Sequence, residues 1–410
     1  MKVIKFGLIL ALTSLLLSGC WDKMELEDQA YVVVLGLDLA KEKNLLDVTF
    51  QIANPQVGST DKSSAPNEPP SDTVTFTAPD ILSAKELANS VVTRKLSFAH
   101  LRTLVIGEKL ARSQLLSNAL VASIRDPELR RETNFIVSAE QAVNFIHNNK
   151  PKLETRPHKY YAFMQQRWRD TGHVPYATLN RFMTRVNGEL FLAIYGTTER
   201  KNSPPKIDED DYLAGQISQV GGDPVQIMGS AVLKNGVMIG KLTGEETRHA
   251  LLLRRKAINH DYVASFPDPL NKNFRVTLRV MKRGNTDIKI NVKKDPPTID
   301  VTVPIKTQLL SIPSLINYAT NLEKQRQFVS SIKEHMEKES QAIIAKSQRE
   351  FKSEPFVWYV EARKQFWTLQ EFEKYDWENQ FAKATVNVKF DVSLESFGKQ
   401  TSPHRIEQKE

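Results

Sequence analysis

The sequence contains almost no cysteine: Cys20 is the single cysteine among 410 residues. No disulfide can therefore form within the chain, and a cysteine-based zinc site is excluded. The eight histidines fall singly on separate predicted elements, so no pair has the spacing of metal ligands. The patterns H-E-x-x-H, G-x-S-x-G and G-x-G-x-x-G after a strand are also missing. We therefore expect no metal, no cofactor, no catalytic residues and no enzymatic activity.

The charge of the chain is not concentrated in one place. Lysine and arginine number 56 against 48 acidic residues, which gives a net charge of +8, and basic residues are interspersed with acidic ones. This pattern argues against a nucleic-acid partner, which usually requires a basic patch. A mildly basic surface favours contact with anionic lipid or with an acidic protein. The length and the 40% apolar content indicate a globular protein of two or three domains.

The N-terminus has a short hydrophobic run rather than a long one. Lys2 and Lys5 precede the apolar stretch 6–17, whose twelve residues fall short of the roughly 20 that a spanning helix needs. The order Leu-Ser-Gly-Cys at 17–20 then places small residues before the thiol of Cys20. We predict a lipoprotein signal peptide at 1–19 and a diacylglycerol thioether on Cys20, giving a lipid anchor outside a cytoplasmic membrane. The alternative is an ordinary secretory signal with an incidental cysteine.

Residues 20–197 alternate between strand and helix patterns. This order predicts a mixed α/β region of one or two subdomains. A polar segment at 54–72, rich in proline and serine, is expected to be a loop. The predicted strands are 29–38, 45–53, 73–77, 100–107, 133–137 and 189–195. The predicted helices are 80–96, 108–124, a short one from Asp126, 139–148, 157–169 and 175–186.

Residues 198–222 have the composition of an interdomain linker. They contain Pro204 and Pro205 and the acidic run 208–211, which we expect to be solvated. The alternative for the acidic run is a cation site. Four adjacent acids alternate around the backbone instead of converging on one ion, so we favour the linker.

Residues 223–400 favour an antiparallel sheet. Asn235-Gly236 between two strand patterns indicates a hairpin, and Thr243 followed by Glu246 forms a capping box at a helix start. Three further strands alternate apolar and polar residues, a long amphipathic helix is expected at 314–351, and a last strand precedes a polar tail at 401–410. The fold class is therefore α+β, with an N-terminal mixed α/β domain and a C-terminal antiparallel sheet packed against a long helix.

An aromatic segment at 356–381 holds three of the five tryptophans. Trp358, Tyr359, Trp367 and Trp377 are the candidate patch for a partner or ligand, since aromatic side chains are enriched at binding surfaces. The alternative, which we favour, is that these side chains pack in the core against the long helix.

Several motifs together resemble one family. They include the L-S-G-C box followed by Trp21-Asp22, the acidic residues 25–28, the strand 31–35 ending in Gly-Leu-Asp, and the block R-D-P-E-L-R at 125–130. The combined pattern resembles the Ger(x)C family, the lipoprotein C subunits of GerA-type nutrient germinant receptors in spore-forming Firmicutes. The chain departs from the usual acidic, glycine-containing turn, because it has Lys-Ser-Glu-Pro-Phe at 352–356.

The resemblance implies a role without catalysis. Such subunits sit on the outer face of the spore inner membrane and assemble with two membrane subunits, of A type and B type, in a complex that senses small nutrients. Two other readings remain open from the residues: a solute-binding lipoprotein of a transporter, and a cell-wall hydrolase. The antiparallel second half argues against the first, and the missing acid pair argues against the second.

Overall fold

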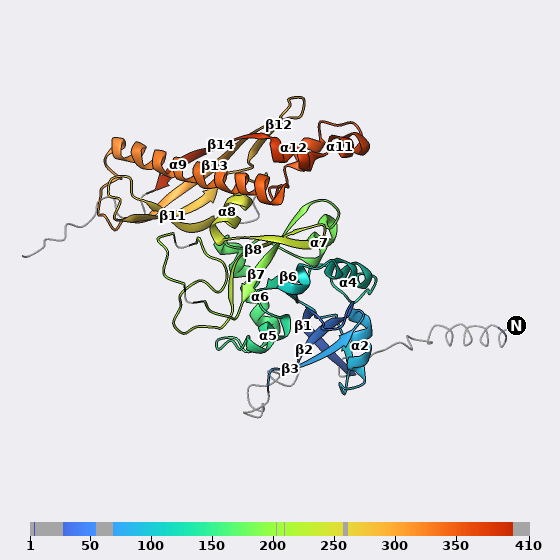
Figure 1. Ribbon diagram of the computed structural model, residues 1–410. Coiled ribbons are helices and arrows are strands. Elements are labelled where there is room, and N and C mark those ends of the chain that lie inside the picture. The colour runs from blue at the N-terminus through green and yellow to red at the C-terminus, as the bar shows by residue number, and fades with distance from the viewer. Residues whose placement is uncertain are drawn as a thin grey trace, which may run out of the picture.

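The protein consists of two β-sheets with helices packed on them, as the computed structural model shows (Figure 1). The structure describes residue 4 and residues 28–54, 69–201, 203–208, 210–256 and 261–396. The predicted signal peptide, Cys20, most of the loop at 54–72 and the polar tail lie outside these residues. Within the described ranges, no helix combines the length and apolar character that crossing a bilayer requires.

The first sheet has nine strands, with a parallel centre and antiparallel flanks. Its order is β3-β2-β1-β5-β6-β7-β8-β9, and β4 pairs with β1 beside this path. Strands β1, β5, β6 and β7 run parallel, while β2, β3, β8 and β9 are antiparallel to their neighbours. The strands are β1 (Gln29–Leu39), β2 (Leu46–Ala53), β3 (Ser71–Ala78), β4 (Lys95–Ser97), β5 (Thr103–Gly107), β6 (Asn134–Ser138), β7 (Leu190–Thr197), β8 (Gln226–Lys234) and β9 (Val237–Leu242).

Helices cover both faces of the first sheet (Figure 1). For this reason the central strands are apolar without alternation: all five residues of β5 and all five of β6 are buried. The helices are α2 (Ile81–Asn89), α3 (Glu108–Ala111), α4 (Leu115–Ser123), α5 (Ala142–Asn148), α6 (Pro157–Thr171) and α7 (Leu179–Arg185). The predicted alternation of strands and helices in this region is confirmed.

Four helix predictions in this region need correction. The helix predicted at 108–124 is divided into α3 and α4, and the one predicted at 175–186 begins only at Leu179, after the cap Thr178. Asp80 caps α2 as predicted, accepting from the backbone N–H groups of Leu82 and Ser83, but α2 ends at Asn89 and not near residue 96. The short helix predicted from Asp126 is only a turn. The Asp126 carboxylate accepts from Glu128 N, which closes the turn. The Glu128 carboxylate accepts from Phe98 N, so the side chain of Glu128 binds a neighbouring segment and does not stabilise the first turn of a helix.

The second sheet has five strands. Strands β11, β12 and β13 are antiparallel, as predicted, and β10, which the sequence did not indicate, adds antiparallel to β11; the last strand, β14, pairs with β13 in parallel. Along β13, Ile299, Val301, Val303 and Ile305 are buried and the residues between them are exposed or half-buried, so one face of the sheet is wet. The strands are β10 (Asp261–Pro267), β11 (Arg275–Lys282), β12 (Asp287–Asn291), β13 (Thr298–Ser311) and β14 (Thr385–Ser396).

The long helix α9 (Leu322–Lys346) lies across the buried face of the second sheet (Figure 1). Phe328, Ile332 and Met336 point inward at helical spacing and are buried, which confirms the predicted packing. The helix starts later than residue 314, because Asn321 caps it, and it continues from Lys346 into a π-turn at Ser347–Phe351. Four shorter helices complete this part: α8 (Gly244–Leu252), α10 (Tyr359–Arg363), α11 (Leu369–Tyr375) and α12 (Trp377–Lys383).

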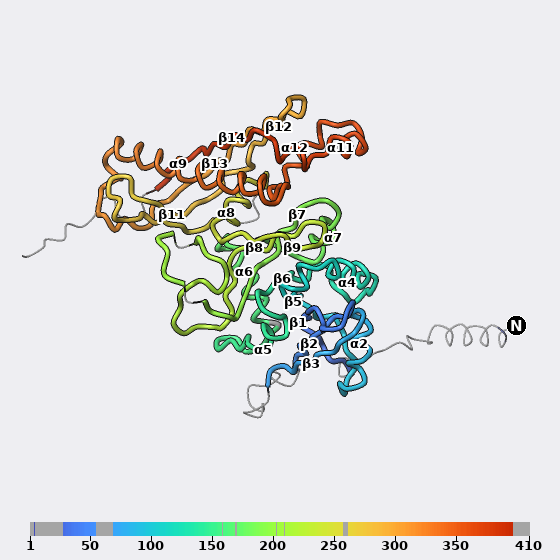
Figure 2. Tube along the Cα trace, in the orientation of Figure 1, coloured from blue at the N-terminus to red at the C-terminus, as the bar shows by residue number. Residues whose placement is uncertain are grey.

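The hairpin β8–β9 belongs to the first sheet, although its sequence lies in the C-terminal half. Asn235 and Gly236 have positive φ, as the predicted turn requires. The hairpin follows the segment 198–222 and adds antiparallel to β7, so the first sheet continues across the predicted linker. The trace in Figure 2 shows β8 and β9 at the end of the first sheet that lies next to the helices α8 and α9.

Candidate functional site

The described residues hold no cluster of three or more histidine, cysteine or acidic side chains that could bind a metal. The predicted lipid site, Cys20, lies outside them. The candidate sites described below are surfaces and polar junctions. They comprise the junction between the two sheets, the aromatic segment and two surface hollows.

The junction contains a buried ion pair that the sequence did not predict. Asp210, expected in a solvated acidic run, is buried and forms an ion pair with Arg248 of α8, which is 4% exposed. Arg248 Nη2 also donates to the backbone oxygens of Thr171 at 2.8 Å and Val263 at 3.1 Å. One guanidinium thus joins the linker, α6 and β10. No sequence signal marked it, because Arg248 lies within an ordinary amphipathic helix pattern.

His173 and Tyr262 complete the surroundings of Arg248. The guanidinium carbon of Arg248 lies 4.5 Å from the centre of the Tyr262 ring, and Nη2 lies 3.2 Å from His173 Nε2. Burial, with the adjacent positive charge of Arg248, lowers the pKa of His173 to about 3. His173 is therefore neutral and accepts from Arg248 through Nε2.

Glu245 is a carboxyl kept neutral in the same region. Burial and, to a smaller extent, the nearby negative charges of Asp210 and Glu339 together raise its pKa to about 8. His335 Nε2 lies 3.9 Å from Glu245 Oε1, but burial lowers the pKa of His335 below its usual 6.5. Neither side chain is charged at pH 7, so this contact is not an ion pair.

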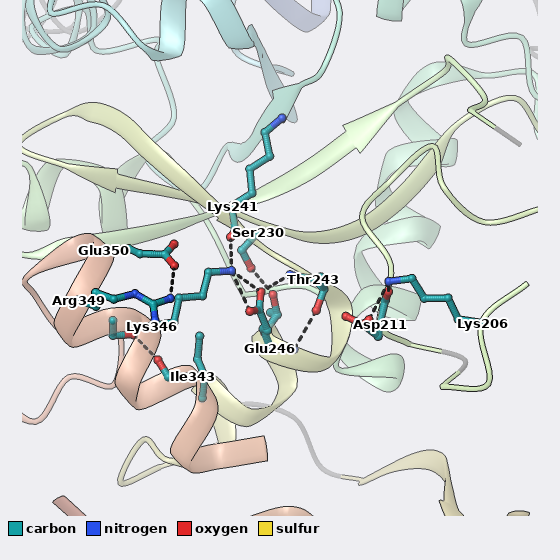
Figure 3. Close-up of polar contacts among 12 residues, drawn as sticks. Lys206, Asp211, Ser230, Lys241, Thr243, Glu246, Ile343, Lys346, Arg349 and Glu350 are labelled. Atoms are coloured by element: carbon teal, nitrogen blue, oxygen red, sulfur yellow. Dashed lines mark hydrogen bonds and ion pairs between the residues drawn. The ribbon is translucent and has the colours of Figure 1, made fainter. Parts of the chain in front are cut away.

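A second set of contacts connects the end of α9 to the start of α8 (Figure 3). The capping box predicted from Thr243 and Glu246 is confirmed, with both reciprocal hydrogen bonds present. Lys346 Nζ lies 2.8 Å from each carboxylate oxygen of Glu246 and 3.2 Å from the backbone oxygen of Lys241 in β9. The lysine therefore fixes α9 to both α8 and the edge of the first sheet.

Lys241 carries the connection into the first sheet. Its Nζ lies 2.7 Å from Glu108 Oε2 of α3 and 2.7 Å from the hydroxyl of Tyr195 in β7. The hydrogen bonds from Lys241, Arg112 and Tyr195 keep the pKa of Glu108 below its usual value, even though burial acts in the opposite direction. This carboxylate is thus ionised and holds β9 against α3.

The four aromatic candidates do not form one surface. Trp358 and Trp377 are buried in the second core, where Trp358 Nε1 donates to the backbone oxygen of Leu253 at 2.9 Å. Tyr359 is half-buried, and its hydroxyl is bonded to Glu189, which raises the pKa of Tyr359 in addition to the effect of burial. Trp367 alone is 98% exposed, just before α11.

The turn at 352–356, where the sequence departs from the family pattern, is built around Glu354. Its buried carboxylate accepts from the N–H groups of Phe356 and Tyr359, each at 2.7 Å. Burial raises the pKa of Glu354 to about 7, while these bonds oppose the rise. Arg254 Nη2 donates to Pro355 O at 2.9 Å, so the turn is held from both sides.

Two surface hollows are large enough to hold a small ligand or a side chain. One, of about 470 Å³, lies between the start of β3 and the segment that follows α5. The other, of about 650 Å³, lies beside α4 near Asn187 and Asn235. Both exceed the roughly 300 Å³ of small ligand sites.

Two family descriptions match consecutive parts of the chain. Residues 22–195 match "Spore germination protein N-terminal domain", and residues 228–398 match "Spore germination B3/GerAC like, C-terminal". The two segments cover most of the described residues, and the gap between them, at 196–227, contains the predicted linker at 198–222.

Curated relatives and one solved structure agree with this match. Spore germination protein KC of Bacillus subtilis (strain 168) is 34% identical over 134 residues, about a third of each chain. Spore germination protein B3 of the same organism is 22% identical over 383 residues, which cover 93% of this chain and 94% of the relative. The crystal structure of the GerBC protein has the same fold, with a TM-score of 0.53 and 17% identity over 88% of this chain and 97% of that one.

Proposed function

Because the chain belongs to the Ger(x)C family of spore germination proteins, we propose that it is the lipid-anchored C subunit of a nutrient germinant receptor. In this proposal it lies on the outer face of the spore inner membrane and acts by protein–protein contact with an A-type and a B-type membrane subunit. The observation that carries the proposal is the match of both family segments, in order, downstream of the L-S-G-C box.

The lipid anchor is the first element of the proposal. Acylation of Cys20 with two chains would hold the protein at the membrane, since two acyl chains suffice for stable anchoring. Anchoring also raises the local concentration of the protein in the membrane plane, so weak contacts with partners are sufficient. In this arrangement the described body needs no span of its own.

Action by contact is the second element. The ionisable groups with shifted pKa values have partners within the fold. The neutral carboxyl of Glu245 lies next to His335 in the junction, and the ionised carboxylate of Glu108 pairs with Lys241 of β9. These perturbed groups have structural partners, which supports a role as a binding subunit. A solute-binding lipoprotein stays the alternative. Calorimetric titration of residues 21–410 with amino acids and sugars distinguishes it, because a tight ligand without any partner would favour that role.

The test is a pair of variants at the lipobox, Cys20→Ala and Ser18→Ala. Cys20→Ala removes the acylated thiol, whereas Ser18→Ala keeps a small residue before it. We expect Cys20→Ala spores to lose the protein from the membrane fraction and to lose the nutrient response. Ser18→Ala spores should keep both. Normal germination of Cys20→Ala spores with every nutrient would contradict the proposal.

A further inference from the structure

Strand β3 is an open edge of the first sheet. Among the described residues it pairs only with β2, over all eight of its residues and without a register shift. Figure 1 shows β3 at the end of the first sheet that lies away from the second sheet. The strand contains no lysine, proline or glycine, which are the residues that usually protect an edge against pairing with another chain.

The other edge strands are protected by side chains from neighbouring elements. Each has a main-chain group that is hydrogen-bonded by such a side chain. These bonds are Lys346 to Lys241 O on β9, Arg248 to Val263 O on β10, Gln365 to Ile290 O on β12, Phe390 N to Glu337 on β14 and Leu96 N to Asn89 on β4. Strand β3 differs, because the side chain that bonds its outer main chain comes from the strand itself: Thr73 N donates to the carboxylate of the preceding residue, Asp72, at 2.8 Å.

The outward main-chain groups of β3 belong to its threonines. Asn54 N donates to Pro70 O, so in the register of β2 and β3 the pair of Gln51 and Thr73 is a non-hydrogen-bonded one, and Thr73 N faces the open side, where it is bonded to Asp72. Along an antiparallel strand the hydrogen-bonding direction alternates, and therefore Thr75 and Thr77 face the same side. The side chains of Thr75 and Thr77 contact β2, at Thr49 and Asp47, which keeps the strand flat against its neighbour.

The hollow of about 470 Å³ opens beside the start of this edge. Ser71, Asp72 and Thr73 form one wall, and the segment after α5 forms the other. The lining is mainly apolar: it includes Pro70, Ile146, Pro151, Pro157 and Tyr160. Lys150 also lines the hollow, and it has no ion pair with any described residue.

We propose that β3 and this hollow together bind an extended segment of a partner protein. The segment adds to the outer edge of β3 as another strand, places a large apolar side chain in the hollow and sets an acidic side chain against Lys150. An edge strand next to a side-chain pocket provides both affinity, through main-chain hydrogen bonds, and specificity, through the pocket. The charge of Lys150 and the apolar lining select the chemistry of the segment.

The inference rests on the proposed function only for the identity of the partner. If the partner is a membrane subunit of a receptor, β3 marks the assembly surface. The strand addition itself is independent of that identity and can be measured with peptides.

The first experiment uses random linear peptides displayed on phage, selected against residues 21–410. Selected peptides are measured against Thr75→Pro and Thr75→Val. Both variants lose the same hydroxyl, but only proline removes the outward N–H, a position at which an edge strand tolerates proline. We expect Thr75→Pro to weaken binding at least tenfold and Thr75→Val to bind as wild type. Thr155→Trp, which fills the hollow, should weaken binding as well.

Three outcomes would overturn the inference: no peptide is selected, selected peptides bind Thr75→Pro unchanged, or the peptides ignore Thr155→Trp. A dimer that Thr75→Pro dissociates would assign the edge to a second copy of the chain and would overturn it too. Equal thermal unfolding of the two Thr75 variants verifies that the fold is intact.

The second experiment separates this inference from the proposed function. Spores carrying Thr75→Pro should lose the nutrient response while keeping the protein in the membrane fraction, and Thr75→Val spores should respond normally. If Thr75→Pro spores respond normally but Cys20→Ala spores do not, the inference fails and the proposed function stands. If both variants respond normally, both fail.

Discussion

The two sheets differ in how many of their faces are covered. The first sheet has helices on both faces and buried, non-alternating strands at its centre, whereas the second has α9 on one face and water on the other. The same number of polar substitutions should therefore damage the first sheet more than the second. The edges differ in the opposite sense. The first sheet has one open edge, β3, whereas the edge strands β10 and β14 of the second sheet each have a main-chain group bonded by a side chain.

The largest expected effect compares one substitution in each sheet. Val105→Asn in β5 puts an amide in a fully buried strand, while Thr302→Asn in β13 stays on the wet face. We expect Val105→Asn to lower the free energy of unfolding by about 3–5 kcal/mol, and Thr302→Asn to change it by less than about 1 kcal/mol. Urea unfolding followed by circular dichroism measures both. Equal losses would show that the two sheets do not differ in this way.

The next effect concerns the junction between the sheets. Arg248→Met removes the guanidinium partner of the buried carboxylate of Asp210, which should cost about 3–5 kcal/mol. The double variant Arg248→Met with Asp210→Leu removes both charges and should recover much of that loss. Thermal unfolding of the three proteins tests this, and a double variant as unstable as the single one would show that the guanidinium bonds to Thr171 and Val263 dominate.

A smaller effect depends on pH. The pKa of Glu245 in the folded protein is raised to about 8, above its ordinary 4.5. Below pH 4.5 both the folded and the unfolded chain are protonated. Between pH 4.5 and 8 the unfolded chain loses this proton first, so Glu245 lowers stability as pH rises. Glu245→Gln should be neutral near pH 4 and stabilising at pH 8 by about 1–2 kcal/mol, after allowance for partial exposure.

Unfolding by urea at pH 4, 6 and 8 gives the difference between Glu245→Gln and wild type. A constant difference across this range would mean that the carboxyl has the same pKa in the folded and the unfolded chain, and that the fold does not raise it. Glu339→Gln is the matched control, because it removes a nearby negative charge without removing the Glu245 carboxyl.

The smallest effect is at the connection between α9 and α8. Lys346→Met removes the contacts with Glu246 while keeping the aliphatic part of the side chain. We expect a loss of about 1 kcal/mol, since the pair is partly exposed and Glu246 keeps its bond to Thr243 N. Differential scanning calorimetry measures it. Lys338→Met, at an 80% exposed lysine of the same helix, should change nothing measurable.

The sequence allowed the fold class to be predicted because its local patterns agree with the packing. The Asn235-Gly236 turn, the Thr243 capping box and the Asp80 cap each depend on neighbouring residues only, and all three are present. The end of α2 and the start of α9 were predicted wrongly. Apolar spacing continues past both points, while the backbone ends the helix at Asn89 and begins it after Asn321.

Long-range contacts could not be predicted from the sequence. Nothing in the run 208–211 indicates that Asp210 meets Arg248, 38 residues later, or that the hairpin after it returns to β7. The aromatic segment shows the same limit of local patterns. The spacing of its aromatic residues does not indicate which of them are buried. Trp358 is buried and donates to the backbone oxygen of Leu253, whereas Trp367 is exposed to water.

The return of β8 and β9 to β7 has a practical consequence for dissecting the molecule. A recombinant fragment ending before residue 198 would present β7 as a bare eight-residue edge of entirely buried side chains. A fragment starting near residue 223 would carry a hairpin that has lost its neighbouring strand. The boundary suggested by the sequence therefore divides one structural unit, and stable halves would require the hairpin to be kept with the N-terminal piece.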